Sequence, residues 1–417
     1  MELIAQIPIA LWIAGALALY MAWAIGANDV ANAMGTSVGS GALTVWGAIL
    51  VAAIFEFAGA FFAGGHVTDT VRKGMLDISL IDRDQLIHGM LGSLAAAGTL
   101  LVVATRFGLP ISTTHAIVGA IVGFGVVSIG PEVVNWGKIG QIVLSWLTSP
   151  LLAGVIAFVI FQFTRAKVLD TKDPVVQIRK LGPVFFFFVF FIIGLVTLFK
   201  GLKPLKLDLN LQEALLGSTL LGFIGAGLGI MLIRRVQLGP EDPKHRFSRV
   251  EKIFVVLQIL TACAIAFAHG SNDVANAIGP LAAISSAISG ADLGGKASVS
   301  PWMLAIGGIG IIFGLATWGY RVMETVGKRI TELTPSRGFA AQLAAATTIV
   351  VASRMGIPIS TTHTLVGAVL GVGLARGISA LDLRGVGKII ASWVATLPIA
   401  AGLSMFFYFF FKGLLAG

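Results

Sequence analysis

Apolar segments of helical length recur along the whole chain and are separated by short polar stretches. Most are close to the ~20 residues that an α-helix needs to cross a bilayer, and the alternating pattern of a membrane β-barrel does not recur. The pattern therefore predicts an all-α integral membrane protein with about 12 membrane helices and half-helices. The predicted helical segments are 4–27, 43–65, 90–107, 111–130, 139–163, 183–200, 211–233, 253–270, 273–288, 301–320, 338–355, 359–375 and 386–411.

Composition agrees with a membrane protein. Of the 417 residues 56% are hydrophobic and only 12% are charged, whereas soluble proteins carry roughly 25% charged residues. The single cysteine, Cys263, lies in an apolar run, which excludes an intramolecular disulfide framework. The N-terminal residues Met1 and Glu2 do not resemble the basic leader of a cleavable signal peptide, so the first apolar run is expected to be retained.

Two motifs each occur twice, at similar separations. The first reads Gly-Ala-Asn-Asp-Val-Ala-Asn-Ala at 26–33 and Gly-Ser-Asn-Asp-Val-Ala-Asn-Ala at 270–277. The second covers 103–115 and 351–363 and ends in Pro-Ile-Ser-Thr-Thr-His both times. A Gly-Lys…Ser-Trp marker follows each copy of the second motif. Matched markers at similar separations indicate that the chain is an internal duplication.

The order of the segments also predicts topology. The helical hairpins expected over 90–130 and 338–375 each enter and leave on one side, so the first half makes an odd number of crossings. Two repeats of opposite orientation follow, with the hairpins meeting at the membrane midplane, as in many secondary transporters. The formal charge of +9 comes from Lys and Arg between apolar runs, which favours cytoplasmic loops over nucleic-acid binding. The expected organisation is a first repeat over 1–233, a basic cytoplasmic linker over 234–252 and a second repeat over 253–417, with both termini extracellular or periplasmic.

The first motif places a carboxylate and two carboxamides at membrane depth, where charge is costly unless it is functional. Asn28 and Asn32 share a helical face with Asp29 beside them, and Gly26 permits a local break that frees carbonyl oxygens. Such oxygens suit a hard cation. The alternative is that these side chains only bond neighbouring helices. The candidate cation ligands are Asn28, Asp29, Asn32, Asn272, Asp273 and Asn276.

The second motif predicts an anion site. Proline followed by Ser and Thr favours a helix start, whose free N–H groups and hydroxyls attract anions. Inverted repeats would bring two such tips together as a donor-rich cage that fits a tetrahedral oxyanion. The alternative is that these residues only cap helices. The candidate anion ligands are Ser112, Thr113, Thr114, Ser360, Thr361 and Thr362.

Five further polar residues lie in or beside apolar runs. His115 and His363 follow the hydroxyl triplets and are expected to orient the hairpins, with proton coupling as the second interpretation. Glu56 is an intramembrane acid that belongs to a cation path or gate, or else has a partner elsewhere in the fold. Gln258 and Gln342 are candidates for a gate or for the transport path.

The paired Asn-Asp-Val-Ala-Asn signature together with the paired Pro-Ile-Ser-Thr-Thr-His segments resembles the inorganic phosphate transporter (PiT) family of sodium/phosphate symporters. The resemblance covers essentially the whole chain in the family's repeat order. It implies import of inorganic phosphate by cation symport through alternating access, with Na⁺ as the coupling ion and no organic cofactor. Gln342 is a departure, because some eukaryotic members have an acid there, and this puts a coupling role at that position in doubt.

Other functions stay open beside Na⁺–phosphate symport. Within transport these are proton-coupled phosphate or metal–phosphate symport and sulfate permeation. A passive anion channel is a separate class. An intramembrane hydrolase is disfavoured because both copies have the same Ser-Thr-Thr-His and the chain lacks a Gly-x-Ser-x-Gly elbow. A homodimer is plausible for such proteins.

Overall fold

The structure is a computed structural model that describes residues 8–65, 74–198, 209–235, 246–290, 299–329, 332–355 and 359–415; the side chains of Asn32, 246–248, 325–329 and 353–354 are not described. These residues are helical, apart from connecting turns and one isolated bridge between Leu76 and Val134. The elements are α2 (Ile9–Ile25), η1 (Gly26–Val30), α3 (Ala31–Gly39), α4 (Val45–Ala63), η2 (Ile78–Leu80), α6 (Arg83–Arg106), α7 (Thr113–Ser128), η3 (Pro131–Val133), α8 (Trp136–Thr164), η4 (Arg165–Leu169), α9 (Pro174–Val196), α10 (Leu211–Arg235), α11 (Arg246–Ile288), α12 (Pro301–Trp318), α13 (Tyr320–Arg329), α14 (Pro335–Arg354), α15 (Thr361–Arg376), η8 (Ile378–Ala380) and α16 (Leu383–Leu415).

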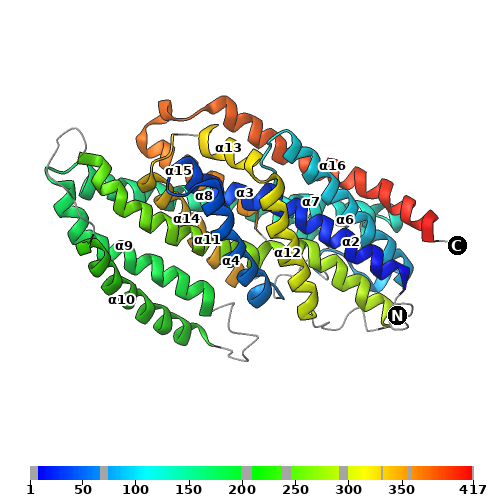
Figure 1. The fold of residues 1–417 in the computed structure, drawn as a ribbon. Coiled ribbons are helices and arrows are strands. Elements are labelled where there is room, and N and C mark those ends of the chain that lie inside the picture. Colours follow the sequence, from blue (N-terminus) through cyan, green and yellow to red (C-terminus); the bar gives the residue numbers. More distant parts are fainter. Residues whose placement is uncertain are drawn as a thin grey trace.

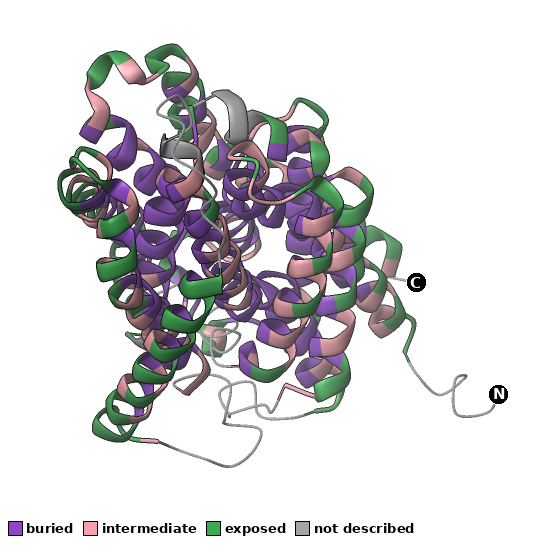
Figure 2. Ribbon diagram, turned by 60° about the vertical axis from the view of Figure 1, so that its left-hand side comes forward, coloured by how far each residue is buried: buried purple, intermediate pink, exposed green. Residues whose placement is uncertain are grey.

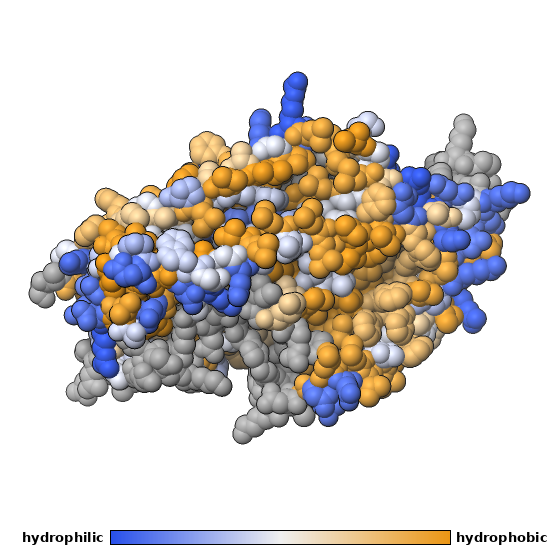
Figure 3. All heavy atoms as spheres, turned by 180° about the vertical axis from the view of Figure 1, so that it is seen from behind, coloured by the Kyte–Doolittle hydropathy of each residue, from blue (hydrophilic) through white to orange (hydrophobic). Residues whose placement is uncertain are grey.

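The surface has the character of a membrane protein. Nine helical segments within the described ranges are long and apolar enough to cross a bilayer. In Figure 3 hydrophobic residues cover the middle of the molecule, while hydrophilic residues gather toward its ends. Figure 2 shows the buried residues concentrated on the inner helices. Because lipid replaces water around the hydrophobic middle of the molecule, large apolar side chains such as Leu216 and Phe223 on α10 remain exposed on its surface.

Several helix boundaries differ from those predicted. The segments predicted as 253–270 and 273–288 form one continuous helix, α11, and the first signature copy is a π-helical turn, η1, between α2 and α3. α9 starts at Pro174 instead of 183, because the Asp173 carboxylate accepts bonds from the first-turn N–H groups of Val175 and Val176. The stretch between the predicted segments 139–163 and 183–200 is therefore mostly helical. Residues 4–7, 199 and 200 of the predicted helical segments lie outside the described residues.

The signature glycines, Gly26 and Gly270, allow neighbouring helices to pack closely. A Cβ atom at Gly26 would overlap the backbone oxygen of Ile311 in α12. A Cβ atom at Gly270 would likewise overlap the backbone oxygen of Glu56 in α4. Only glycine allows the backbones to approach so closely. Each signature is therefore packed against a helix of the other half of the chain.

The helical hairpins also exchange partners between the two halves of the chain. The hairpin of α6 and α7 packs on α16, and the hairpin of α14 and α15 packs on α8. Gly119 of α7 lies against the backbone of Leu397, and Gly367 of α15 lies against Pro150. In Figure 1 α2 starts and α16 ends on the right, while α9 and α10 form an outlying pair on the left. The return arm of each hairpin is thus held by the helix that directly follows the hairpin of the other half.

Candidate ion and oxyanion site

The two signature carboxylates meet at the centre of the molecule. Asp29 on η1 and Asp273 on α11 are both at most 2% exposed. The hydroxyl of Thr361 lies 2.8 Å from Asp273 Oδ2 and 3.5 Å from Asp29 Oδ2, so it joins the two acids. Carboxylates from signatures about 240 residues apart in sequence therefore share one buried site.

Hydroxyls from both hairpin tips surround these carboxylates. Thr113 Oγ1 at the start of α7 donates to Asp29 Oδ2 at 2.8 Å, and Thr362 Oγ1 donates to Asp29 Oδ1. Thr114 Oγ1 donates to the backbone oxygen of Ile359 at 3.3 Å, which links one tip directly to the other. All these threonines are at most 4% exposed. The predicted meeting of two hydroxyl-bearing tips is therefore present in the structure.

The two serines of the tips cap helices. Ser112 Oγ accepts the N–H of His115 at 3.2 Å, and Ser360 Oγ accepts the N–H of His363 at 3.1 Å. Each serine thus satisfies one N–H group at the start of its helix. Of the six predicted anion ligands, the serines make capping bonds here, whereas three threonines donate to carboxylates.

The first carboxamide of each signature, Asn28 or Asn272, has different hydrogen-bond partners in the two copies. Asn28 Nδ2 donates to Thr105 Oγ1 at 2.9 Å and to the Leu109 oxygen at 3.0 Å, while its Oδ1 accepts from Ile111 N at 3.1 Å. Its amide therefore fastens η1 to the first hairpin. Asn272 Nδ2 donates to Asp273 Oδ1 at 2.9 Å, and Asn272 Oδ1 is buried without a partner among the described residues.

Asn276 faces the opposite tip. Its Nδ2 donates to Thr113 Oγ1 at 3.2 Å and to Thr114 Oγ1 at 3.4 Å. The second signature is thereby bonded to the first hairpin. Asn32, the counterpart of Asn276, has a side chain outside the described residues, so its predicted role stays a prediction.

His269, which is not among the predicted site residues, completes this group of buried side chains. His269 Nε2 lies 2.6 Å from Asp273 Oδ2 and 3.9 Å from Asp29 Oδ1, and its Nδ1 lies 3.1 Å from Glu56 Oε2. Ligand atoms of Asp29, His269 and Asp273 lie within 4.8 Å of one another, a group able to hold a cation. Glu56 thus has a partner, on a helix 213 positions further along the chain.

Comparison with known proteins identifies the family. The model of the phosphate transporter family matches residues 25–404. The chain belongs to this family. A protein of Haemophilus influenzae named "Putative phosphate permease" is 48% identical over 98% of both chains. The "Inorganic phosphate transporter 2-1, chloroplastic" of Arabidopsis thaliana is 44% identical over 95% of this chain and 71% of its own.

A solved structure has the same fold. "The sodium-dependent phosphate transporter" matches with a TM-score of 0.89 and 41% identity, covering 97% of this chain and 99% of the other. The predicted resemblance is confirmed, and the chain is a multi-pass membrane protein of a transporter family. Membership supports phosphate transport and disfavours the hydrolase interpretation.

In this phosphate transporter family member a second polar cluster lies beside the site. Gln342 of α14 donates to Thr36 Oγ1 at 2.8 Å and to Ser37 Oγ at 2.7 Å, and it accepts from Thr261 Oγ1 at 2.9 Å. Gln258 of α11 donates to the Thr36 oxygen at 3.1 Å. All of these groups are buried, and each of these bonds joins α3 to α11 or α14, or α11 to α14. We call this group the amide cluster.

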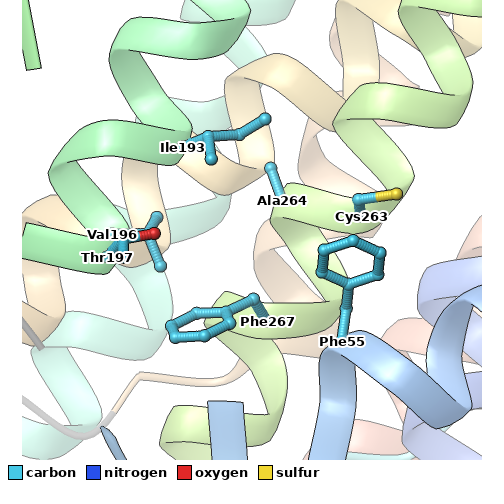
Figure 4. Close-up of a pocket in the computed structure, with 7 residues that line it drawn as sticks. All are labelled: Phe55, Ile193, Val196, Thr197, Cys263, Ala264 and Phe267. Carbon is cyan, nitrogen blue, oxygen red and sulfur yellow. The ribbon is translucent and has the colours of Figure 1, made fainter. Parts of the chain in front are cut away.

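A crevice on the outer surface has a different character. It lies between α4, α9 and α11, and Figure 4 shows Cys263 beside Phe55 and Phe267. Its lining is almost entirely apolar, with Thr197 as its one hydroxyl. The crevice offers no charge for phosphate or a cation, so it is separate from the site at Asp29 and Asp273.

His269 carried a signal that could have been found in the sequence. It stands directly before the second signature, one helical turn from Asp273, inside an apolar run. The corresponding residue before the first signature is Ile25. An ionisable residue in only one copy of a repeat indicates a function that the two copies do not share.

Proposed function

We propose that the protein is a secondary transporter that imports inorganic phosphate together with Na⁺ by alternating access. The observation that supports this most directly is the convergence of Asp29 and Asp273 with hydroxyls of both hairpin tips in one buried cluster. The sodium-dependent transporter that shares 41% of its sequence supports the choice of ion. A cation neutralises the charge that a phosphate anion would otherwise bring into lipid.

The acids and amides of the two signatures hold Na⁺ in this proposal. Carboxylate and carboxamide oxygens are ligands that hard cations prefer. The unpartnered Oδ1 of Asn272 beside Asp273 is one such oxygen. Asn28 contributes less directly, since its amide is already bonded to the first hairpin. The full set is Asn28, Asp29, Asn32, Asn272, Asp273 and Asn276.

The tip hydroxyls hold phosphate. Thr113, Thr361 and Thr362 donate to carboxylates in this structure. When Na⁺ occupies the carboxylate oxygens, these hydroxyls are released to donate to phosphate oxygens. Cation binding thereby creates the phosphate site, which gives a physical reason for coupled transport.

We infer that the chain divides into two repeats of opposite orientation at the predicted linker over 234–252. Residues 236–245 of this linker lie outside the described residues, and its two ends belong to α10 and α11. Equivalent contacts support this division: α7 with α16 matches α15 with α8, and the contact of Gly26 with Ile311 matches that of Gly270 with Glu56. α9 and α10 have no counterpart among the described helices after α11. These two helices therefore extend the first repeat over 1–233, and because they add two crossings the number of membrane crossings in that repeat stays odd.

The amide cluster closes the site on the side where α11 begins. The equivalent residues of the other repeat are apolar, so the site is closed by polar side chains on one side and by apolar side chains on the other. Gln258 corresponds to Ala14, Thr261 to Leu17, Ser37 to Leu281 and Gln342 to Leu94. Amides and hydroxyls exchange their partners for water at little net cost, whereas apolar contacts do not. The amide cluster thus forms a gate that opens to water on that side.

Labelling from each side tests this gate. In a Cys263→Ala background, we expect Ser37→Cys to react with a membrane-impermeant thiol reagent from the side of α11's start during transport. We expect Leu281→Cys to react from the opposite side. Both residues are fully buried here, so reaction requires opening. Reaction of Ser37→Cys from the opposite side, or from neither side while uptake persists, would refute the gate.

Uptake of radioactive phosphate into proteoliposomes tests the function itself. We expect an inward Na⁺ gradient to drive uptake and excess sulfate to leave it unchanged. Uptake driven only by protons would assign the acids, and with them His115 and His363, to proton coupling. Competition by sulfate would indicate a sulfate permease, and flux without any cation gradient would indicate a channel. A homodimer stays a prediction.

Threonine variants test the phosphate ligands. We expect Thr113→Val or Thr361→Val to raise the half-saturating phosphate concentration by about tenfold, which is the loss of one good hydrogen bond. Valine keeps the shape of threonine and removes only the hydroxyl. Thr219→Val is the matched control, because among the described residues the Thr219 hydroxyl donates to the Leu215 oxygen of its own helix, α10. A larger change in the Na⁺ constant than in the phosphate constant would reverse the assignment.

A further inference from the structure

Two histidines and two tryptophans form a compact group directly behind the hairpin tips. The ring of His115 packs against Trp146 at a tilt of 34° with centroids 3.6 Å apart, and the ring of His363 stacks on Trp393 at the same separation. The two histidine rings meet edge to face at 4.3 Å. Both histidines are 3% exposed and Trp146 is 4% exposed. Rings from both halves of the chain are thus packed into one aromatic group.

The hydrogen bonds of this group cross between the halves. His115 Nδ1 lies 3.4 Å from the backbone oxygen of Trp393, and His363 Nδ1 lies 3.3 Å from that of Trp146. A carbonyl oxygen only accepts, so each Nδ1–H is the donor. Each histidine therefore packs its ring against the tryptophan of its own half and donates to the backbone oxygen of the tryptophan of the other half.

Proline makes one of these carbonyls available. In a regular helix the Trp146 oxygen would accept from residue 150, but Pro150 has no N–H. The oxygen is thereby left for His363. Pro398 lies five residues after Trp393 in α16 and disturbs the same stretch of the second helix. The missing proline N–H thus accounts for the free Trp146 oxygen in α8, whereas the regular helical donor to the Trp393 oxygen would be Leu397 and not Pro398.

The group acts on residues of the phosphate site. His115 directly follows Thr113 and Thr114, and Trp393 Nε1 donates to the Pro110 oxygen at 3.3 Å. We infer that Trp146 and Trp393 are positioning residues that, with the two histidines, lock the hairpin tips together and so set the spacing of the tip hydroxyls. The inference rests on the proposed role of those hydroxyls in holding phosphate.

Leucine and phenylalanine variants test the inference through transport constants. We expect Trp146→Leu and Trp393→Leu each to raise the half-saturating phosphate concentration by about tenfold, with a smaller change in the Na⁺ constant. Trp146→Phe is the matched control, because it keeps an aromatic ring and Trp146 Nε1 has no partner to lose among the described residues. It should stay within about twofold of wild type.

The double variant and the wild type separate the outcomes. If the tips are locked as one unit, Trp146→Leu with Trp393→Leu should cost less than the two single effects combined. A purely structural role would lower the amount of folded protein and the maximal rate but leave the phosphate constant unchanged, which would overturn the inference. Wild-type protein without phosphate uptake would instead refute the proposed function, before any variant is compared.

Discussion

Replacing Asp29 by Asn, or Asp273 by Asn, should reduce Na⁺-driven phosphate uptake by at least about 100-fold while protein remains in the membrane. The change keeps the size of the side chain and removes its charge. Asp29 accepts bonds from Thr113 and Thr362, and bonds to a charged acceptor contribute about 1.5–3 kcal/mol each. The carboxylate is also the strongest cation ligand available in the site, so affinity for Na⁺ falls at the same time.

Uptake under an inward Na⁺ gradient, normalised to the amount of protein in the liposomes, measures this effect. Asp170→Asn is the matched control. Its carboxylate pairs with Arg165 at the surface with 58% of the side chain exposed, and exposed pairs contribute about 0–1 kcal/mol. It should leave uptake within about twofold of wild type. Normal uptake by Asp29→Asn or Asp273→Asn would refute a site shared by the two repeats.

Replacing His269 by Ile should destabilise the protein strongly, by about 3–5 kcal/mol, the usual cost of removing one partner from a buried ionic group. His269 lies between Asp273, Glu56 and Asp29, and all of them are at most 2% exposed. Without the imidazole, buried carboxylates face one another and Glu56 loses the hydrogen bond of its Oε2. The expected result is a large fall in the thermal midpoint of the purified protein.

The other repeat supplies a compensating variant. There the equivalent positions are Ile25 and Ile311, as the matched contacts of Gly26 and Gly270 show. We expect Glu56→Ile together with His269→Ile to recover part of the lost stability, because the double change removes both members of the Glu56–His269 pair but leaves Asp29 and Asp273 without the imidazole. If the double variant is no more stable than His269→Ile alone, Glu56 and His269 do not act as a pair.

Much of the architecture was readable from the sequence. Apolar run lengths predicted most of the spanning helices, since a helix in lipid must cover the thickness of the bilayer. The duplicated motifs predicted that two hairpin tips and two acids would meet, and Thr361 between Asp29 and Asp273 joins them. The predicted helix boundaries were less accurate. The segments predicted as 253–270 and 273–288 form the single helix α11, in which Gly270 allows close packing against Glu56.

The tertiary structure decided which polar groups become partners. Glu56 and His269 are 213 positions apart, and His363 and Trp146 are 217 apart, so no local pattern relates them. Ser112 and Ser360 make capping bonds in this structure while their role as anion ligands stays a prediction, and Gln258 and Gln342 meet α3 in the amide cluster. Hydrophobic periodicity and motif spacing describe each helix along its own axis. The partners of a buried polar group depend on how helices cross, and that is settled by the packing of the whole molecule.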